Sequence, residues 1–453
     1  MSATLLNRSS NSLELENNQH QLTSPAINDS FLFGDLPDDE FLKRLPLKSL
    51  LRCMCVQKSW YRLIKTPNFI NLHTVYQYHH QNNNNNNDDD PPSKYLLFSS
   101  PHERKLLYLR YDDEQCAEFR RLKYPHIPPD VHGHSNGLIC FSNLFSWRNF
   151  YSDIFLWNPL IKKTKTLPPL RLLKLPSHSY VDLVLWRDTA FAYLPSINDY
   201  QVVKIMFQYD PFDPYQLTYL FCVYSLSTDS WKAKFCDPCD TNVVRMNDEK
   251  ESVFVDGIAC WMIACDDTNL NKVLCFHTIN FTLHFVDLPQ VGEYHRLHQF
   301  GQSVALFTED KLNNFHMSIL KQDSITNDFF WENKVTVELQ QPIFSRVIGL
   351  RNNGELVLVK KSQKVYGLVS YDPESKNLKD FVQSWKGWST RGYDDLFDEH
   401  PPFLVHPFVG SLVLMNTDSN NQPVCRLPKL QRNKHCENRR FTTTAVCRSR
   451  MVS

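Results

Sequence analysis

The sequence has little glycine, no excess of charge of either sign and no long apolar run. Glycine supplies 12 of the 453 residues, and the 49 Lys and Arg residues equal the 49 Asp and Glu residues in number. A balanced charge creates no long-range attraction toward nucleic acid or a membrane surface, so neither is expected as a partner. No run reaches the roughly 18 apolar residues that a membrane-spanning helix needs. We therefore expect a chain that does not cross a membrane.

The cysteines and the N-terminal segment indicate a reducing compartment. Thirteen cysteines are scattered without a regular spacing, a pattern that does not predict a disulfide framework. Residues 1–30 are rich in Ser and Asn, and they lack both the apolar core of a secretory signal and the Arg-rich character of a transit peptide. We predict a disordered arm over residues 1–30 and a cytoplasmic or nuclear location, or both.

Residues 35–71 form the clearly helical part of the sequence. Pro46 can open a helix at its first turn, and Pro67 ends a second helix because it has no N–H to donate. Each helix carries apolar residues at helical spacing, so each has one apolar face. Two such short helices cannot bury both faces against each other, so the segment needs a partner. The two stripes are Leu47, Leu50, Leu51, Met54 and Cys55, then Val56, Trp60, Leu63 and Ile64.

The order of residues in this segment resembles the F-box of plant F-box proteins. The matching pieces are Leu36-Pro37, residues 45–52, Val56, residues 58–60 and Leu63-Ile64. The resemblance implies an F-box over residues 31–73, which docks on a Skp-type adaptor and through it on a cullin. The family usually has about three more residues before the second Leu-Pro, nearly one helical turn, so a short first helix is expected. A plain helical hairpin that caps the next domain is the alternative. By residue match, the implied adaptor contacts are Leu36, Pro37, Leu45, Pro46, Leu50, Leu51, Val56 and Trp60.

Polar segments lie on both sides of the next domain. Residues 82–87 are all Asn and are followed by three Asp and two Pro. Sequence of this kind buries too little to offset its ordering entropy, so we predict a linker over residues 74–94; an aggregation-prone tract is the alternative. Residues 426–453 hold eight Lys and Arg against one Glu. We predict a disordered basic tail over residues 417–453, with a nuclear-localisation or nucleic-acid role as the alternative.

From Tyr95 onward the pattern changes to short strands. Asn136-Gly137, Asp256-Gly257 and Asn353-Gly354 each precede a β-rich run and predict hairpin turns, because these residue types tolerate positive φ. A strand, a polar turn and another strand also recur every 43 to 69 residues. Such a repeat of short antiparallel strands is typical of propeller blades. The marker residues of the repeat are Asn158, Ser227, Asn280, Asp323 and Asp372.

We predict a mainly β protein with a small N-terminal α module, in which residues 95–416 form a kelch-like β-propeller of about six blades. A pair of β-sandwiches is the alternative. Residues 135–140, 156–159, 230–231 and 255–261 resemble the signatures of the F-box-associated domain that follows the F-box in plant proteins. We expect these signature residues to pack blades and form turns rather than to contact a ligand.

Two motifs suggest other chemistry. Residues 133–137 read Gly-x-Ser-x-Gly, the elbow that presents a serine nucleophile in hydrolases, but an elbow needs a helix after the serine and this one runs into a strand. Cys236 and Cys239, with Cys260 and Cys265, approach the spacing of a four-cysteine zinc site. The last two lie five apart on one predicted strand, so their side chains point to opposite faces. His132 and His134 are expected to be turn and edge residues.

The resemblance implies a protein that is not itself an enzyme. It would be the substrate-recognition subunit of a Skp-cullin-F-box ubiquitin ligase, with the F-box on the adaptor and the β domain on a protein substrate. An F-box-like interaction protein that joins no ligase is the alternative. No catalytic residue, metal or cofactor is predicted, and the residues that bind the substrate follow no general code. The F-box and the β domain are expected to be separable modules with separate cores.

Overall fold

The structure is a computed structural model. It describes residues 38–82, 94–99, 106–113, 116–123, 129–143, 153–170, 184–209, 217–236, 244–246, 252–265, 271–289, 294–310, 314–323, 328–337, 344–362, 365–382 and 404–416. The predicted N-terminal arm, most of the predicted linker and the predicted basic tail lie outside the described residues.

Four helices form an N-terminal helical module, residues 38–82. They are α1 (Asp38–Leu42), α2 (Leu47–Val56), α3 (Lys58–Ile64) and α4 (Pro67–Asn82). Pro46 is the N-terminal cap of α2, and α1 has only five residues, as the short spacing predicts. Extended backbone at Gln57 (φ −138°, ψ 134°) separates α2 from α3.

Helix α4 corrects the predicted domain boundary. The linker prediction is wrong for residues 74–82, because α4 continues to Asn82. The buried stripe of α4 includes the polar residues His73, Thr74 and Gln77 beside Phe69 and Ile70. A stripe with so many polar members produces no apolar periodicity, which explains why the sequence pattern does not show the helix.

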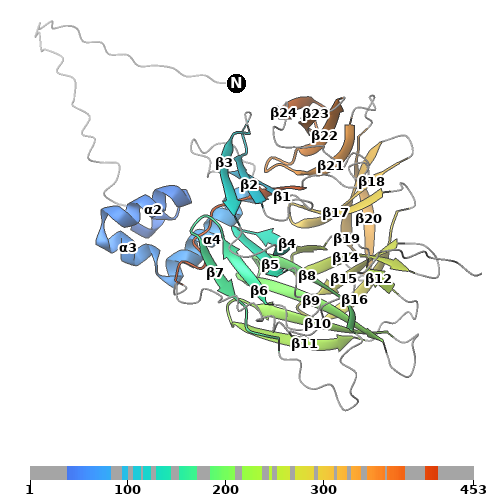
Figure 1. Ribbon diagram of the computed structural model, residues 1–453, viewed down its shortest axis with the longest axis horizontal. Coiled ribbons are helices and arrows are strands. Elements are labelled where there is room, and N and C mark those ends of the chain that lie inside the picture. The colour runs from blue at the N-terminus through green and yellow to red at the C-terminus, as the bar shows by residue number, and fades with distance from the viewer. Residues whose placement is uncertain are drawn as a thin grey trace, which may run out of the picture.

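Twenty-five described strands build six blades around a ring (Figure 1). Blade 1 contains β25 (Leu404–Phe408), β1 (Tyr95–Ser99), β2 (Leu106–Tyr111) and β3 (Glu118–Lys123); blade 2 contains β4 (Pro129–Ser135), β5 (Leu138–Asn143), β6 (Ile154–Asn158) and β7 (Lys163–Thr166); blade 3 contains β8 (Val184–Leu194), β9 (Asp199–Tyr209), β10 (Leu217–Ser225) and β11 (Ser230–Cys236).

Blade 4 has its first strand in two pieces, and blades 5 and 6 repeat the simple four-stranded order. Blade 4 contains β12 (Val244–Met246) and β13 (Ser252–Val255), which both pair with β14 (Ile258–Cys265), then β15 (Asn271–His277) and β16 (Thr282–Asp287); blade 5 contains β17 (Tyr294–Phe300), β18 (Ser303–Glu309), β19 (Phe315–Gln322) and β20 (Phe329–Val337); blade 6 contains β21 (Phe344–Leu350), β22 (Leu356–Ser362), β23 (Val365–Tyr371) and β24 (Leu378–Val382).

Six buried apolar clusters among the described residues show that the blades form a closed ring. Each cluster lies between two neighbouring blades, in the order 1–2, 2–3, 3–4, 4–5, 5–6 and 6–1. Between blades 3 and 4, for example, the rings of Phe221 and Phe276 stack with centroids 4.0 Å apart. A pair of sandwiches would have one core each. The predicted propeller of about six blades is therefore confirmed, and the sandwich alternative is wrong.

The repeat markers occupy equivalent places in the ring. Asn158, Ser227, Asn280, Asp323 and Asp372 each lie at the connection between the third and fourth strands of blades 2 to 6. The equivalent connection in blade 1, between β2 and β3, begins at Asp112. The irregular spacing of the markers thus reflects connections of different length between equivalent strands.

The predicted hairpins form, although one turn differs from expectation. Asn136 and Asp256, each followed by Gly, have positive φ (40° and 47°), and they link β4 to β5 and β13 to β14. In the third hairpin only Gly354 has a positive φ, 86°. Its N–H donates to the carbonyl oxygen of Arg351 at 3.1 Å. This turn therefore contains more residues than the expected two.

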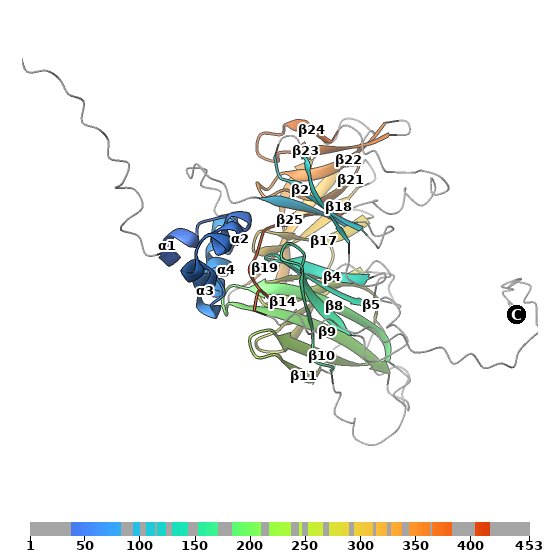
Figure 2. The same ribbon diagram turned by 60° about the vertical axis from the view of Figure 1, so that its left-hand side comes forward.

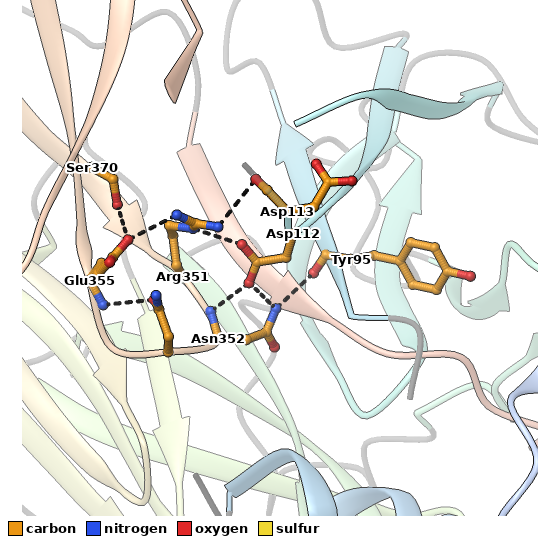
Figure 3. A network of polar contacts seen from close by, with 8 residues as sticks. Tyr95, Asp112, Asp113, Arg351, Asn352, Glu355 and Ser370 are labelled. Atoms are coloured by element: carbon orange, nitrogen blue, oxygen red, sulfur yellow. Dashed lines mark hydrogen bonds and ion pairs between the residues drawn. The ribbon is translucent and has the colours of Figure 1, made fainter. Parts of the chain in front are cut away.

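A polar network joins blade 6 to blade 1 (Figure 3). Arg351 donates from Nε to Oδ1 of Asp112 at 2.7 Å and from Nη1 to Oε2 of Glu355 at 2.9 Å. Asn352 donates to Oδ2 of Asp112 from its backbone N–H and from Nδ2. Burial raises the pKa of Glu355, but the Ser370 hydroxyl and the Arg351 charge outweigh burial and hold that pKa below its usual value. The network ties together two parts of the ring that lie 239 residues apart in sequence.

Candidate functional site

The helical module packs directly on the propeller beside blades 2 and 3 (Figures 1 and 2). The ring of Tyr78 in α4 meets the ring of Tyr193 in β8 edge to face, with centroids 5.2 Å apart. A Cβ added to Gly410 would lie 2.9 Å from Cβ of Leu47, so α2 and the segment after β25 approach as closely as glycine allows. Module and propeller therefore have a fixed relative position.

The inner sides of the helices belong to the core between blades 2 and 3. Leu50 is fully buried, and Leu47 lies in the same cluster as Leu156 and Tyr224 of the propeller. The propeller of the same chain therefore covers part of the apolar stripes for which the sequence predicted a partner. The expectation of two separate cores is therefore wrong. Members of the shared core from the helices are Leu42, Leu47, Leu50, Ile64, Phe69 and Ile70.

Residues 409–416, called the closing segment here, lie between the helices and the blades. Asn158 is fully buried, and its Nδ2 donates to the carbonyl oxygens of Ser411 (2.7 Å) and Val413 (2.9 Å). Its Oδ1 accepts a hydrogen bond from the backbone N–H of Leu160 at 3.2 Å. Asn416 extends the contact by donating from Nδ2 to the carbonyl oxygen of Lys65. The signature residue Asn158 thus forms a turn and holds packing partners, as predicted.

His73 on α4 hydrogen-bonds to the segment just before α2 and so holds the start of that helix. Its Nε2 donates to the carbonyl oxygen of Leu45 at 3.4 Å, across 28 residues. Burial lowers the pKa of His73 to about 4, which the hydrogen bond to Leu45 only partly offsets, so the ring is neutral near pH 7. A neutral imidazole can remain in this apolar core without the cost of a buried charge.

The outer side of α2 and α3 combines exposed apolar residues with positive charge. Val56 has 76% of its surface exposed and Tyr61 has 45%. The sequence contains no acidic residue between Glu40 and Asp88. We call this surface the outer face; its exposed cations are Lys48, Arg52, Lys58 and Arg62.

The residues matched to adaptor contacts fall into four groups. Leu50 is in the core, and Val56 is on the outer face. Leu45, Pro46, Leu51 and Trp60 are half-buried, and all but Pro46 pack against the shared core. Leu36 and Pro37 lie outside the described residues. Sequence matching did not identify Tyr61 or the cations of the outer face, although the long stretch without an acidic residue was a signal for the charge.

The elbow motif does not form a nucleophile site. Gly133 and Ser135 lie in β4, and a two-residue turn connects that strand to β5 instead of to a helix. The Ser135 hydroxyl oxygen accepts a hydrogen bond from the backbone N–H of Tyr193 at 2.9 Å. Ser135 therefore links blades 2 and 3, and the hydrolase interpretation is wrong.

The three cysteines singled out for zinc that the structure describes lie on strands of two different blades. Cys236 ends β11 in blade 3, whereas Cys260 and Cys265 share β14 in blade 4 as expected; Cys239 lies outside the described residues. Within the described ranges, no three His, Cys, Asp or Glu residues are arranged to hold a metal ion. Sγ of Cys260 instead lies 3.1 Å from Sγ of Cys275, a residue that the motif search did not identify.

His132 and His134, at the elbow motif, lie on β4, which is the edge strand of its sheet. His132 hydrogen-bonds through Nε2 with the Ser142 hydroxyl at 2.8 Å, and the ring of His134 lies 4.4 Å from the ring of His406. Burial, with the neighbouring His406, holds the pKa of His134 well below its usual value. The contact of His134 with His406 joins the first strands of blades 2 and 1, whereas that of His132 with Ser142 joins β4 to β5 within blade 2.

Comparison with known families identifies the propeller. A family described as "F-box associated beta propeller domain" matches residues 79–398. The chain belongs to this F-box-associated family. The resemblance to plant F-box proteins with an F-box-associated domain is thus confirmed. The matched range begins in α4, so α1, α2 and α3 lie before it.

Curated relatives of this F-box-associated protein come from Arabidopsis thaliana. F-box protein CPR1 is 30% identical over 212 residues, 44% of each chain. Putative F-box protein At1g33530 is 27% identical over 261 residues, 54% of this chain and 49% of the relative. The chain thus spans about half the length of these relatives. Among solved structures, TolB from Acinetobacter baumannii is 11% identical, with a TM-score of 0.32 over 63% of both chains.

No helix in the described ranges has the length and apolarity that crossing a membrane requires.

Proposed function

We propose that this protein is the substrate-recognition subunit of a Skp-cullin-F-box ubiquitin ligase. In this proposal the helical module binds a Skp-type adaptor, which connects it to a cullin, and the propeller holds a protein substrate. The other subunits transfer ubiquitin, so this chain needs no catalytic residue, metal or cofactor of its own. The observation that carries the proposal is the outer face, which stays exposed although the other sides of the helices are packed on the propeller.

The outer face has the composition of a protein-binding surface. An exposed apolar centre with a polar or charged rim is typical of protein interfaces. Val56 and Tyr61 supply the apolar part. Exposed cations such as Arg52 and Lys58 lie close to them in sequence, on the same two helices. An adaptor surface with an apolar pocket and acidic residues would be complementary in both respects.

The eight residues matched to the family keep different roles in this proposal. Val56 is the exposed contact, and Leu51 and Trp60 supply their half-exposed surface. Leu50 holds α2 on the propeller, because its side chain has no exposed surface. Pro46 and Leu45 fix the start of the same helix. Leu36 and Pro37 complete the proposed set on residue match.

Packing of the helical module on the propeller would fix how a substrate is presented. Because the module and the propeller share a core, a substrate held on the propeller would keep a fixed orientation relative to the adaptor. A rigid connection of this kind limits the positions that a bound substrate can sample near the ubiquitin-transferring subunits. The proposed compartment is the cytoplasm, the nucleus or both, where free cysteines stay reduced.

A second candidate is an F-box-like interaction protein that joins no ligase. The observation that favours it is the five-residue length of α1. A short first helix offers less surface to an adaptor and would weaken its binding.

Co-expression of the full chain with a Skp-type adaptor and a cullin separates the two candidates. We expect both partners to co-purify with the wild-type chain. A variant with three residues inserted between Asp39 and Arg44 restores about one helical turn and measures what the short helix costs. Recovery of adaptor and cullin only with the lengthened variant would favour the second candidate, and recovery with neither chain would contradict the proposal.

A further inference from the structure

Two buried thiols meet inside blade 4. Cys260 on β14 and Cys275 on β15 are directly opposite each other in the antiparallel register. Their Sγ atoms are 3.1 Å apart, and both residues are fully buried. No other side chain separates the two sulfur atoms at this distance, so each thiol is the other's direct neighbour.

The cross-strand register of the pair is compatible with a disulfide. Directly opposed residues in antiparallel strands have Cα atoms about 4.5 to 5.5 Å apart, within the range of about 4.4 to 6.8 Å found across disulfides. A bond would bring the sulfurs to about 2.05 Å. Rotation of the two side chains can supply this movement without a change of strand register.

Two other buried cysteines, in blades 2 and 3, have no cysteine opposite them among the described strands. Cys222 on β10 is opposite Lys204 and Ala233, and Cys140 on β5 is opposite Gly133 and Leu156. Both are as fully buried as the pair in blade 4. Burial alone therefore does not distinguish Cys260 and Cys275; their cross-strand register does.

We propose that Cys260 and Cys275 form a redox-responsive pair that hydrogen peroxide converts into a cross-strand disulfide. One thiolate attacks a peroxide oxygen and the O–O bond breaks, which leaves a sulfenic acid and hydroxide. The second thiolate attacks the sulfenic sulfur and displaces hydroxide. The two thiol protons combine with the released hydroxide ions. In balance, two thiols and one hydrogen peroxide give one disulfide and two waters.

The environment of the pair makes the reaction slow and selective. Burial, together with the adjacent Cys275 thiol, raises the pKa of Cys260 well above its usual value, so little thiolate is present. Neither residue has exposed surface, so a reagent reaches the sulfur atoms only when the blade opens locally. Cys55 on α2 is exposed and should react first. Oxidation of the pair would therefore report strong or lasting peroxide exposure.

The bond would join two strands of blade 4 beside the core that blade 4 shares with blade 5. Cys260 and Cys275 belong to the core between blades 4 and 5, together with Val286 and Leu297. A disulfide there would tie β14 to β15 and raise the midpoint of thermal unfolding, because it restrains the unfolded chain. This consequence does not depend on the proposed ligase function.

The test uses the purified full chain, treated with hydrogen peroxide, then alkylated under denaturing conditions, digested and examined by mass spectrometry. We expect a linked pair of peptides that contain Cys260 and Cys275, with the loss of two hydrogen atoms. Cys275→Ser should abolish the link, whereas Cys222→Ser, which removes an equally buried thiol, should keep it. Full alkylation of Cys260 and Cys275 after peroxide has oxidised Cys55 would overturn the proposal. This last result is read on wild-type protein, so it does not depend on the folding of any variant.

Discussion

Arg351 in blade 6 and Asp112 in blade 1 form an ion pair with Nε and Oδ1 2.7 Å apart, across 239 residues of sequence. Both side chains are nearly inaccessible to solvent, at 11% and 4% exposure. In the same ring, β25 from the end of the described chain pairs with β1. The ring is therefore closed by backbone pairing of β25 with β1 and with β21, and by a buried polar contact between blades 6 and 1 (Figure 3).

Asp112→Ala should destabilise the whole ring. The substitution removes one of the two carboxylates that pair with the buried Arg351 guanidinium, and removing one partner of a buried pair costs about 3 kcal/mol. Chemical unfolding of the purified protein measures this loss. The matched control is Asp380→Ala, which breaks the exposed pair between Lys360 and Asp380 (3.3 Å) and should cost less than about 1 kcal/mol. Equal stability of the two variants would mean that the buried network does not hold the ring closed.

Leu50→Ala should destabilise the propeller as well as the helices. Leu50 is fully buried in the core that α2 shares with blades 2 and 3, and such a truncation typically costs about 3 kcal/mol. Unfolding followed by fluorescence should show one transition, shifted to lower denaturant. Val56→Ala, on the exposed end of α2, is the control and should leave the transition unchanged. An unshifted transition in Leu50→Ala would restore the separate-module interpretation.

Stability should fall as the pH is lowered from about 6.5 to about 4. Burial lowers the pKa of His73 to about 4, below its ordinary value of 6.5. In that interval the unfolded chain takes up a proton that the folded chain does not, so unfolding becomes more favourable as pH falls. Above pH 6.5 both states are neutral and the contribution is complete.

His73→Gln should reduce this pH dependence, measured as the difference between unfolding midpoints at pH 7 and pH 5. The reduction is partial, because burial also lowers the pKa of His406 to about 4 and that of His298 to about 3. His79→Gln is the control, since His79 on the same helix is exposed. A His73→Gln variant with the full wild-type pH dependence would show that this ring does not contribute.

Local patterns predicted those parts of the fold that depend on neighbours in sequence. Asn136-Gly137 predicted a hairpin because the positive φ of a tight turn depends on the turn residues themselves. The repeat markers predicted blades because each marker also lies in a local strand-turn-strand pattern. The end of α4 was missed because His73, Thr74 and Gln77 fill its buried stripe with polar residues.

Contacts between strands and between blades could not be predicted in this way. The pairing of Cys260 with Cys275 depends on strand register, and the pairing of Asp112 with Arg351 depends on ring closure. The role of Leu50 was assigned from the family match alone. Its apolar character was evident, but whether the propeller or a second protein covers it is decided by tertiary packing.

The most direct test of the central claim is the affinity of a Skp-type adaptor for the full chain, measured by titration calorimetry for wild type, Val56→Asp and Ile279→Asp. Val56 and Ile279 are both exposed apolar residues, at 76% and 63%, but Ile279 lies in the turn between β15 and β16 of blade 4. A charge at Val56 should weaken binding by about 2 kcal/mol or more, roughly 30-fold, as expected for an interface hot spot. Ile279→Asp should bind as wild type does. Equal affinity of Val56→Asp and wild type would contradict the assignment of the outer face as the adaptor-binding surface.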